Sequence, residues 1–459
     1  MWGLVAQGPK MDILRQTHGF TTGEDIASLI TDVLLRLQLP LEGLRGQTYD
    51  GAANMNGNKK GVQSILIAKQ PLADYIHCGA HCCNLIMKNV CDSSKEVRNS
   101  LDYLHQLGNL FSNAKVKSIF TYIQEDLAQC PVINAGRIKP LCPTRWIYRH
   151  SQINEALKKY DIILKTLEEL TSKNYDGASG LLNTFLNGTT YLGLIMGKKI
   201  IEMLETINKL FQGKKNTLSG LCKSIEVMIQ GLSDLRSEEN FSKVFEECSA
   251  AIQQNDLEEL SLPRQKKPPK RYSGPAPSHG YNSCEEYYRQ QFYHMVDTAI
   301  SGLKSRILDQ PGVKKQILLE NVLLKFEKSE SLNCYPEIDV DALKIELQLF
   351  HKNFKVNCLD DARKALSSTI KEVRCLFKSV ENLVRLLLVC PASSCEAERS
   401  FSALRKLKMY LRSTMTQKRL NHVALCYVHK NILDVIDSKK VAQIFISQVQ
   451  SRKNIFGVI

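Results

Sequence analysis

The chain has 459 residues, and 61 Lys and Arg against 47 Asp and Glu give it a formal net charge of +14. This length has room for two or three domains with sizeable cores. No apolar run approaches the ~18 residues of a membrane-spanning helix, and the N-terminal residues lack the apolar core of a signal peptide. Fifteen scattered cysteines are more typical of reduced thiols than of a disulfide framework. We therefore expect an intracellular protein without a membrane partner, and the basic excess is compatible with a polyanion such as DNA.

The first part of the chain mixes short strands with helices. Thr21-Thr22-Gly23-Glu24 is typical of a capping box, and an apolar helical face follows it. That face is predicted to comprise Ile26, Leu29, Ile30, Val33, Leu34 and Leu37. A strand is predicted over 44–49, ending at Asp50, and a second over 74–78, followed by a helix that carries His81. This alternation predicts an α/β layer.

From residue 96 to 377 the apolar spacing is almost wholly helical, with one break at 262–283. The break contains five prolines and a basic cluster, so we expect an exposed loop without regular structure. Lys266, Lys267, Lys270 and Arg271 are its candidate DNA contacts. A solvated run of charges is the alternative interpretation of the same cluster.

The stretch from Val389 to Met415 carries the most information. Ser393 and Ser394 follow Pro391 and can cap a helix whose first turn contains Glu396 and Glu398. The buried face of this helix is predicted to comprise Phe401, Leu404, Leu407 and Leu411. By themselves these residues indicate either a capped helix with acids that complement its dipole, or a carboxylate placed to hold a metal ion.

Four motifs resemble those of the hAT-superfamily transposases and of host proteins derived from them, such as the zinc finger MYM-type protein 1-like proteins. They are TYDGAANMNG (48–57), HCGAHCCNL (77–85), CPTRW (142–146) and SSCEAERSFSALRKLK (393–408). Each motif is short, but together with later residues up to Asn421 they occur in the family's order.

The resemblance implies a mainly α chain with an α/β part, in which an incomplete RNase H-like core is split by a large all-helical insertion. Residues 1–95 would be the N-terminal part of that core without its first strands. Residues 96–377 would be the insertion, with its exposed loop at 262–283. Residues 378–459 would return to the core and form the hAT dimerisation region.

In the family, Asp50 and Glu398 match the second and third acids of a site that binds two Mg²⁺ ions for phosphodiester chemistry. The first acid should lie on an opening strand, and Asp12 is the one Asp before the predicted helix, in surroundings that do not match. We therefore interpret Asp50 and Glu398 as vestigial, with no cofactor expected and Mg²⁺ bound there only if the chain is active. The sequence around Asp50 is also explained by a simple Asp-Gly turn.

Cys78 and His81 match a family motif that lies beside the active site. Zinc is an alternative, but structural zinc needs two such pairs and the sequence offers one. We expect a buried thiol at a strand end and a histidine at a helix start. Trp146 matches a tryptophan proposed to stack on a displaced base, and Arg145 beside it can contact a phosphate. A tryptophan packed where the insertion meets the core is the alternative.

The sequence thus predicts a nuclear, transposase-derived protein that dimerises and binds DNA without sequence selection. The candidate dimerisation residues are Phe401, Leu404, Leu411, Val423 and Tyr427. The alternative is an enzyme, a metal-dependent hAT-type transposase or nuclease that uses Asp50 and Glu398.

Overall fold

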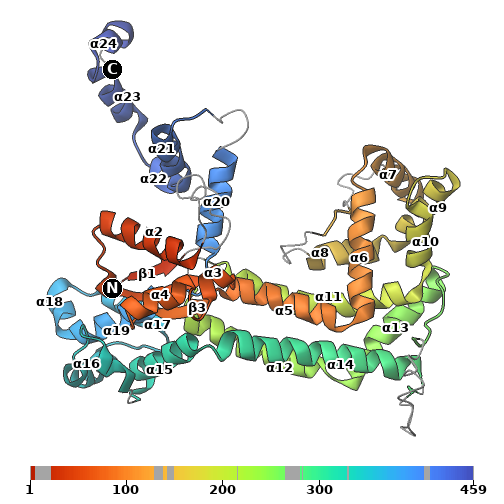
Figure 1. Cartoon of the computed structure of the whole chain (residues 1–459), viewed down its shortest axis with the longest axis horizontal. Helices are drawn as coiled ribbons and strands as arrows, with labels where there is room; N and C mark the ends of the chain where they lie inside the picture. Colours follow the sequence, from red (N-terminus) through yellow and green to blue (C-terminus); the bar gives the residue numbers. More distant parts are fainter. Residues whose placement is uncertain are drawn as a thin grey trace. The chain divides into compact units, whose positions relative to one another are not determined.

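The computed structural model describes residues 2–5, 22–128, 138–141, 149–213, 216–263, 280–281, 283–327, 330–407 and 414–457. They form two units, Met1–Ser394 and Cys395–Ile459, which we describe separately. The first unit contains a small parallel sheet and many helices, and the second contains helices (Figure 1). The prediction of a mainly helical chain with an α/β part is confirmed.

The sheet has three parallel strands in the order β1-β2-β3. They are β1 (Trp2–Val5), β2 (Leu44–Tyr49) and β3 (Asp74–His77). The strand predicted at 44–49 is confirmed, and the one predicted at 74–78 ends one residue earlier. Strand β1, which pairs with β2, was not predicted from the sequence. Every residue of β2 is buried, as expected for a central parallel strand.

Helix α2 (Gly23–Arg36) packs near β2 and begins with a true capping box. Thr22 Oγ1 accepts the N–H of Asp25, and the Asp25 carboxylate accepts the N–H of Thr22. The acid that closes the box is therefore Asp25, and the predicted box with Glu24 is wrong by one residue. Leu34 is buried, whereas Val33 and Leu37 of the predicted face are exposed. Three short helices complete this part: η1 (Leu41–Gly43), α3 (Ala53–Asn56) and α4 (Val62–Lys69).

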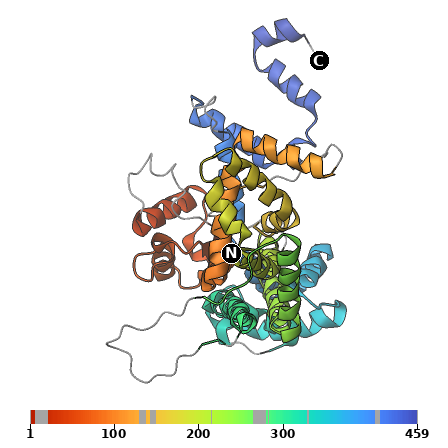
Figure 2. The same cartoon turned by 90° about the vertical axis from the view of Figure 1, so that its right-hand side faces the viewer.

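A helical body follows β3, as the spacing predicts. Its helices are α5 (Gly79–Ser93), α6 (Lys95–Leu110), α7 (Ala114–Ala128), α8 (Arg149–Lys158), α9 (Tyr160–Ser172), α10 (Ala178–Leu186), α11 (Gly188–Phe211), α12 (Leu218–Leu235), α13 (Glu238–Gln254) and α14 (Cys284–Leu303). The long helix α11 contacts α5, α6, α12 and α14. Figure 2 shows these helices in the view turned by 90°. Of the predicted loop at 262–283, residues 264–279 and 282 lie outside the described part.

The chain then returns to the sheet through a second group of helices. They are η3 (Lys304–Leu308), α15 (Pro311–Lys325), η4 (Glu330–Cys334), α16 (Val340–Asn353), α17 (Leu359–Ser368), α18 (Lys371–Arg374), η5 (Cys375–Phe377) and α19 (Lys378–Val389). One hydrophobic core joins α15 to α19, while α15 contacts β3 and α19 contacts β2. This core extends across residue 377. The domain boundaries at 95 and 377 remain predictions.

The second unit consists of α20 (Cys395–Leu407), α21 (Gln417–Val428), α22 (Lys430–Leu433), α23 (Ser438–Ser447) and α24 (Gln450–Phe456). Helix α20 contacts α21, and α23 contacts α24. In the part of the chain that the structure describes, no helix combines the length and apolarity needed to cross a membrane.

Candidate acidic site at the carboxyl edge of the sheet

Asp50 and Cys78 follow neighbouring parallel strands, so they meet at the same edge of the sheet. The register pairs Tyr49 with His77, and the N–H of Cys78 donates to the Tyr49 carbonyl at 2.9 Å. This bond extends the β2–β3 ladder by one residue. The second acid of the family motif and the Cys-x-x-His motif are therefore neighbours in space.

Asp50 begins a tight turn. Its Oδ1 accepts the N–H of Ala52 at 3.3 Å, which is the geometry of an Asx turn. Gly51 follows, and a Cβ at this position would lie 2.9 Å from Cε1 of His77 and 3.0 Å from its Nε2. The turn backbone thus packs on the His77 ring, and only glycine fits this close approach. These contacts agree with the interpretation of Asp50 as the start of an Asp-Gly turn, and Asp50 is partly exposed.

Two histidines adjoin this turn. The rings of His77 and His81 have centroids 5.5 Å apart, and His81 lies in the first turn of α5. Burial, with smaller contributions from His81 and Arg306, lowers the pKa of His77 to about 4. Its Nε2 is buried without a hydrogen-bond partner among the described atoms. His77 is therefore neutral at physiological pH, and its ring serves as packing for the Asp50–Gly51 turn.

This histidine makes stability depend on pH. In the folded chain His77 stays neutral down to about pH 4, whereas in the unfolded chain it takes up a proton below the ordinary histidine pKa of 6.5. Its contribution is complete above pH 6.5 and is lost as the pH falls toward 4, by about 2–3 kcal/mol. We expect His77→Phe to flatten the pH dependence of urea unfolding between pH 6.5 and 4. A matched change at the exposed His294 of α14 should leave the curve as it is, and equal curves for both variants would contradict the assignment.

The thiols of the motif are buried. Cys78 is 1% exposed, and its Sγ accepts the N–H of Ser394 at 3.3 Å. Burial raises the pKa of Cys82 to about 12 and raises that of Cys83 well above its usual value. Thiols held protonated are poor zinc ligands. Within the described ranges, no group of three or more His, Cys, Asp or Glu side chains is placed to hold a metal ion.

The segment 390–394, which ends at the start of α20, is anchored at this edge. Thr48 Oγ1 donates to the Pro391 carbonyl at 2.5 Å, and the N–H of Gly79 donates to the Ala392 carbonyl at 3.0 Å. Ser393 Oγ donates to the Phe211 carbonyl at 2.7 Å, and α20 begins at Cys395, so Ser393 lies one residue before the N-cap position. Four hydrogen bonds, including that of Ser394, thus tie this segment to β2, α5 and α11.

Several of the predicted site residues, or their side chains, lie outside the part of the chain that the structure describes. Glu398 lies in α20, in the second unit, and its side chain is outside the described residues. The pairing of Asp50 with Glu398 therefore remains a prediction. Also outside the described residues or side chains are Asp12, Arg145, Trp146, Lys266, Lys267, Lys270, Arg271, Phe401 and Leu411.

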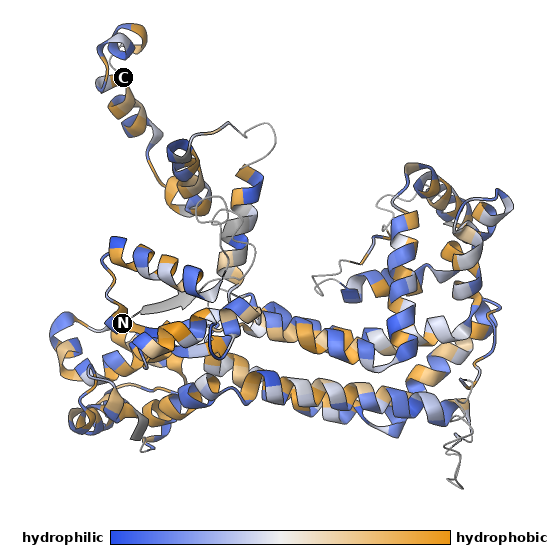
Figure 3. Ribbon diagram, viewed as in Figure 1, coloured by the Kyte–Doolittle hydropathy of each residue, from blue (hydrophilic) through white to orange (hydrophobic). Residues whose placement is uncertain are grey.

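The C-terminal helices expose many apolar side chains, some within the predicted dimerisation set and some outside it. Leu404 and Val423 of the predicted dimerisation set are partly buried, and Tyr427 is 48% exposed. Apolar side chains of α21 outside this set are also exposed, namely Leu425 at 62% and Val428 at 53%. Figure 3 shows apolar residues along these helices and along α23. Apolar surface of this extent is typical of an association site.

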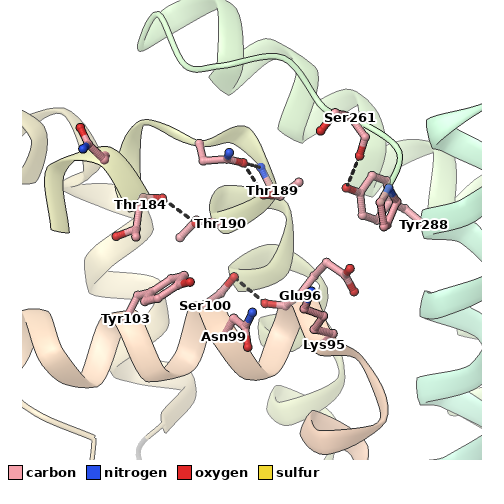
Figure 4. Close-up of a pocket in the computed structure, with 13 residues that line it drawn as sticks. Lys95, Glu96, Asn99, Ser100, Tyr103, Thr184, Thr189, Thr190, Ser261 and Tyr288 are labelled. Carbon is pink, nitrogen blue, oxygen red and sulfur yellow. Dashed lines mark hydrogen bonds between the residues drawn. The ribbon is translucent and has the colours of Figure 1, made fainter. Parts of the chain in front are cut away.

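A polar cavity of about 340 Å³ lies in the helical body, between α6, the start of α11 and Tyr288 (Figure 4). Several of its hydroxyl groups are already used locally. Ser100 Oγ donates to the Glu96 carbonyl at 2.8 Å, and Thr190 Oγ1 donates to the Thr184 carbonyl at 2.6 Å. The Tyr288 hydroxyl donates to the Ser261 carbonyl at 3.1 Å. We assign no ligand to this cavity.

Comparison with known protein families places these features in context. A model of the hAT family C-terminal dimerisation region matches residues 358–432. A second model, described as a ZMYM1/FAM200 RNase-like domain, matches residues 17–61. Two separate segments of the chain are therefore similar to domains of hAT-derived proteins. The RNase-like match contains α2, β2 and Asp50, and the dimerisation match runs from α17 to α22 and contains Glu398.

Two curated relatives are similar to this chain along most of its length. The 52 kDa repressor of the inhibitor of the protein kinase from Homo sapiens is 22% identical over 431 residues, which cover 87% of this chain and 54% of the relative. Its counterpart from Mus musculus is 22% identical over 443 residues, which cover 89% and 56%. The chain spans about half the length of the curated relatives that it matches.

Proposed function

We propose that this chain is a transposase-derived protein that self-associates through its C-terminal region, binds DNA without sequence selection in the nucleus, and does not cut it. The observation that carries the proposal is the match of residues 358–432 to the hAT dimerisation region, together with the apolar side chains that α21 and α22 expose. Water contact with apolar surface is unfavourable by about 25 cal/mol per Å². A second copy of the chain can remove this surface from water.

The proposal that the chain binds DNA is supported by its positive net charge. The formal net charge of +14 favours a polyanionic partner over a neutral or acidic one. Backbone contacts by Lys and Arg supply most of the affinity of binding that is not sequence-specific. We expect such binding to weaken steeply with added salt.

The proposal that the chain does not cut DNA is supported by the residues at the carboxyl edge of the sheet. Residues Trp2 to Val5 of β1, the strand beside β2, include no carboxylate. The Asp50 carboxylate has a local role as acceptor of the Ala52 N–H. His77, which is neutral, packs under the turn and supplies no charge. A two-metal site requires several acids from separate elements, and Asp50 is the acid that these strands bring to the edge.

A metal-dependent nuclease is the second candidate, because Asp50 keeps a partly exposed carboxylate at the edge and the segment before Glu398 is anchored there. The test is nicking of supercoiled plasmid with Mg²⁺ or Mn²⁺. We expect the wild-type chain and Glu398→Gln to show the same background level. Metal-dependent nicking by the wild type that Glu398→Gln abolishes would overturn the non-catalytic proposal.

A further inference from the structure

Helices α18 and α19 border an open hollow of about 610 Å³ whose charged lining residues are mostly basic. We call it the basic hollow and define it by Lys371, Arg374, Lys378, Glu381 and Arg385. None of these residues belongs to the sheet edge or to the predicted loop at 262–283. Four cations against one carboxylate give the basic hollow a formal charge of +3.

Helix geometry brings these side chains together. Lys378, Glu381 and Arg385 are spaced by three and four residues, so they share one face of α19. Lys371 and Arg374 are three residues apart on α18, and η5 connects the two helices with a short turn. Buried Phe377 in η5 fixes this turn in the core. The cations are therefore held on packed backbone.

Glu381 organises the two guanidinium groups. Arg374 binds it in a two-pronged pair, with Nε to Oε2 at 2.8 Å and Nη2 to Oε1 at 2.6 Å. Arg385 forms an ion pair with the same carboxylate. The hydrogen bond from Arg374 is the main cause that holds the pKa of Glu381 below its usual value. The carboxylate stays ionised, and one acid thus orients two arginines without neutralising both.

The two lysines remain available for a ligand. Both are exposed, and in the described part of the chain no ion pair joins Lys371 or Lys378 to an acidic side chain. The nearby Glu346 is engaged elsewhere, because its Oε2 accepts the N–H groups of Ser379 and Val380 at 2.7 and 3.0 Å. Glu346 therefore caps α19 and does not fill the basic hollow.

We propose that the basic hollow binds the phosphodiester backbone of nucleic acid, an inference that rests on the proposed DNA binding and gives it a site. The exposed ammonium groups of Lys371 and Lys378 can contact phosphate oxygens without restricting sequence, and the guanidinium N–H groups that do not bind Glu381 can donate beside them. The basic hollow lies within the region matched by the dimerisation model, but a surface of this charge repels a second copy of itself. A polyanion is the complementary partner.

The test measures binding of the full chain to a labelled mixed-sequence DNA duplex by fluorescence anisotropy at several salt concentrations. Lys371→Gln/Lys378→Gln removes two charges without disturbing Glu381. Each lost phosphate contact should reduce the slope of log affinity against log salt by about 0.9, so we expect a slope shallower by about 1.8 and an affinity tens of fold weaker at about 0.1 M salt. Lys371→Arg/Lys378→Arg should restore the wild-type slope.

The matched control is Lys115→Gln/Lys117→Gln, which removes the same charge from two exposed lysines of α7. An equal loss in this control would overturn the assignment to the basic hollow. If the wild type binds the duplex and Lys371→Gln/Lys378→Gln has the same salt slope, the basic hollow is not the binding site, but the proposed DNA binding stands. If the wild type does not bind the duplex, the proposed DNA binding is wrong as well. If inorganic tripolyphosphate stabilises the wild type against heat but not Lys371→Gln/Lys378→Gln, and the DNA slope is unchanged, the ligand is a free polyphosphate and the nucleic-acid assignment is wrong.

Discussion

Leu425→Glu/Val428→Glu is expected to turn the self-associating chain into a monomer. The two side chains are three residues apart on α21, so they share one helical face, and each is more than half exposed. Burying one such side chain contributes about 1.5–3 kcal/mol. Losing two in each subunit, and placing carboxylates there instead, should weaken dimerisation at least about 100-fold. Sedimentation velocity at micromolar concentration measures this change.

The control for this experiment is Ile345→Glu/Leu349→Glu. These residues lie four apart on α16, are 70% and 42% exposed, and precede the region matched by the dimerisation model. The control places the same charges on a comparable apolar face, so it tests whether any surface of this kind matters. An association constant that falls as much in the control as in Leu425→Glu/Val428→Glu would remove α21 from the interface.

Gly79→Ala is expected to cause the largest loss of stability among changes at the sheet edge. A Cβ at Gly79 would lie 2.1 Å from Cε1 of Phe211, a ring that is 2% exposed and has no free space to move into. Overpacking of this kind costs about 1–3 kcal/mol, and occasionally more. The Phe211 carbonyl also accepts the Ser393 hydroxyl, so a shift of α11 would loosen the anchored segment before α20. Urea unfolding of the full chain measures the change.

Gly180→Ala is the matched control for this substitution. Gly180 lies in α10, and a Cβ there would meet nothing within 4 Å. Alanine in a helix is favoured over glycine by about 0.5–1 kcal/mol, so this variant should be equal to the wild type or slightly more stable. If Gly79→Ala is as stable as Gly180→Ala, the close packing of α5 on Phe211 is not a determinant of stability.

Strands β2 and β3 and many of the helices near the carboxyl edge of the sheet were predictable, because the residues that specify them are close together in the sequence. The turn at Gly43 and the Asp50–Gly51 pair bound residues 44–49 on both sides, and these turn residues define both the strand β2 and the turn that follows it. β1 was missed because its partner strand, β2, lies far along the chain. Parallel pairing of this kind depends on tertiary contacts that no window of sequence contains.

The buried face of a helix was predicted less accurately than the position of the helix in the sequence. The spacing in α2 includes Val33 and Leu37, yet the stripe that packs on β2 and α4 is the one with Ile26, Ile30 and Leu34. In the same way, Val423 on α21 is partly buried while Leu425 is exposed. Apolar periodicity identifies a helix that buries a face, but the neighbour that covers the face decides which residues become buried.

The roles of polar side chains were the hardest to predict. Ser393 resembles a helix cap in sequence, but its hydroxyl donates to the carbonyl of Phe211, far away in the chain. The basic hollow was not predicted either, because its cations come from α18 and α19 and appear in sequence as ordinary surface charges. Only the turn at η5 and the shared Glu381 bring them to one place.

The mass of the wild-type chain in solution tests the central claim most directly. We expect sedimentation equilibrium across micromolar concentrations to give a mass that rises toward twice the 51.9 kDa of one chain. A mass that stays at 51.9 kDa at every concentration would contradict self-association through the C-terminal region.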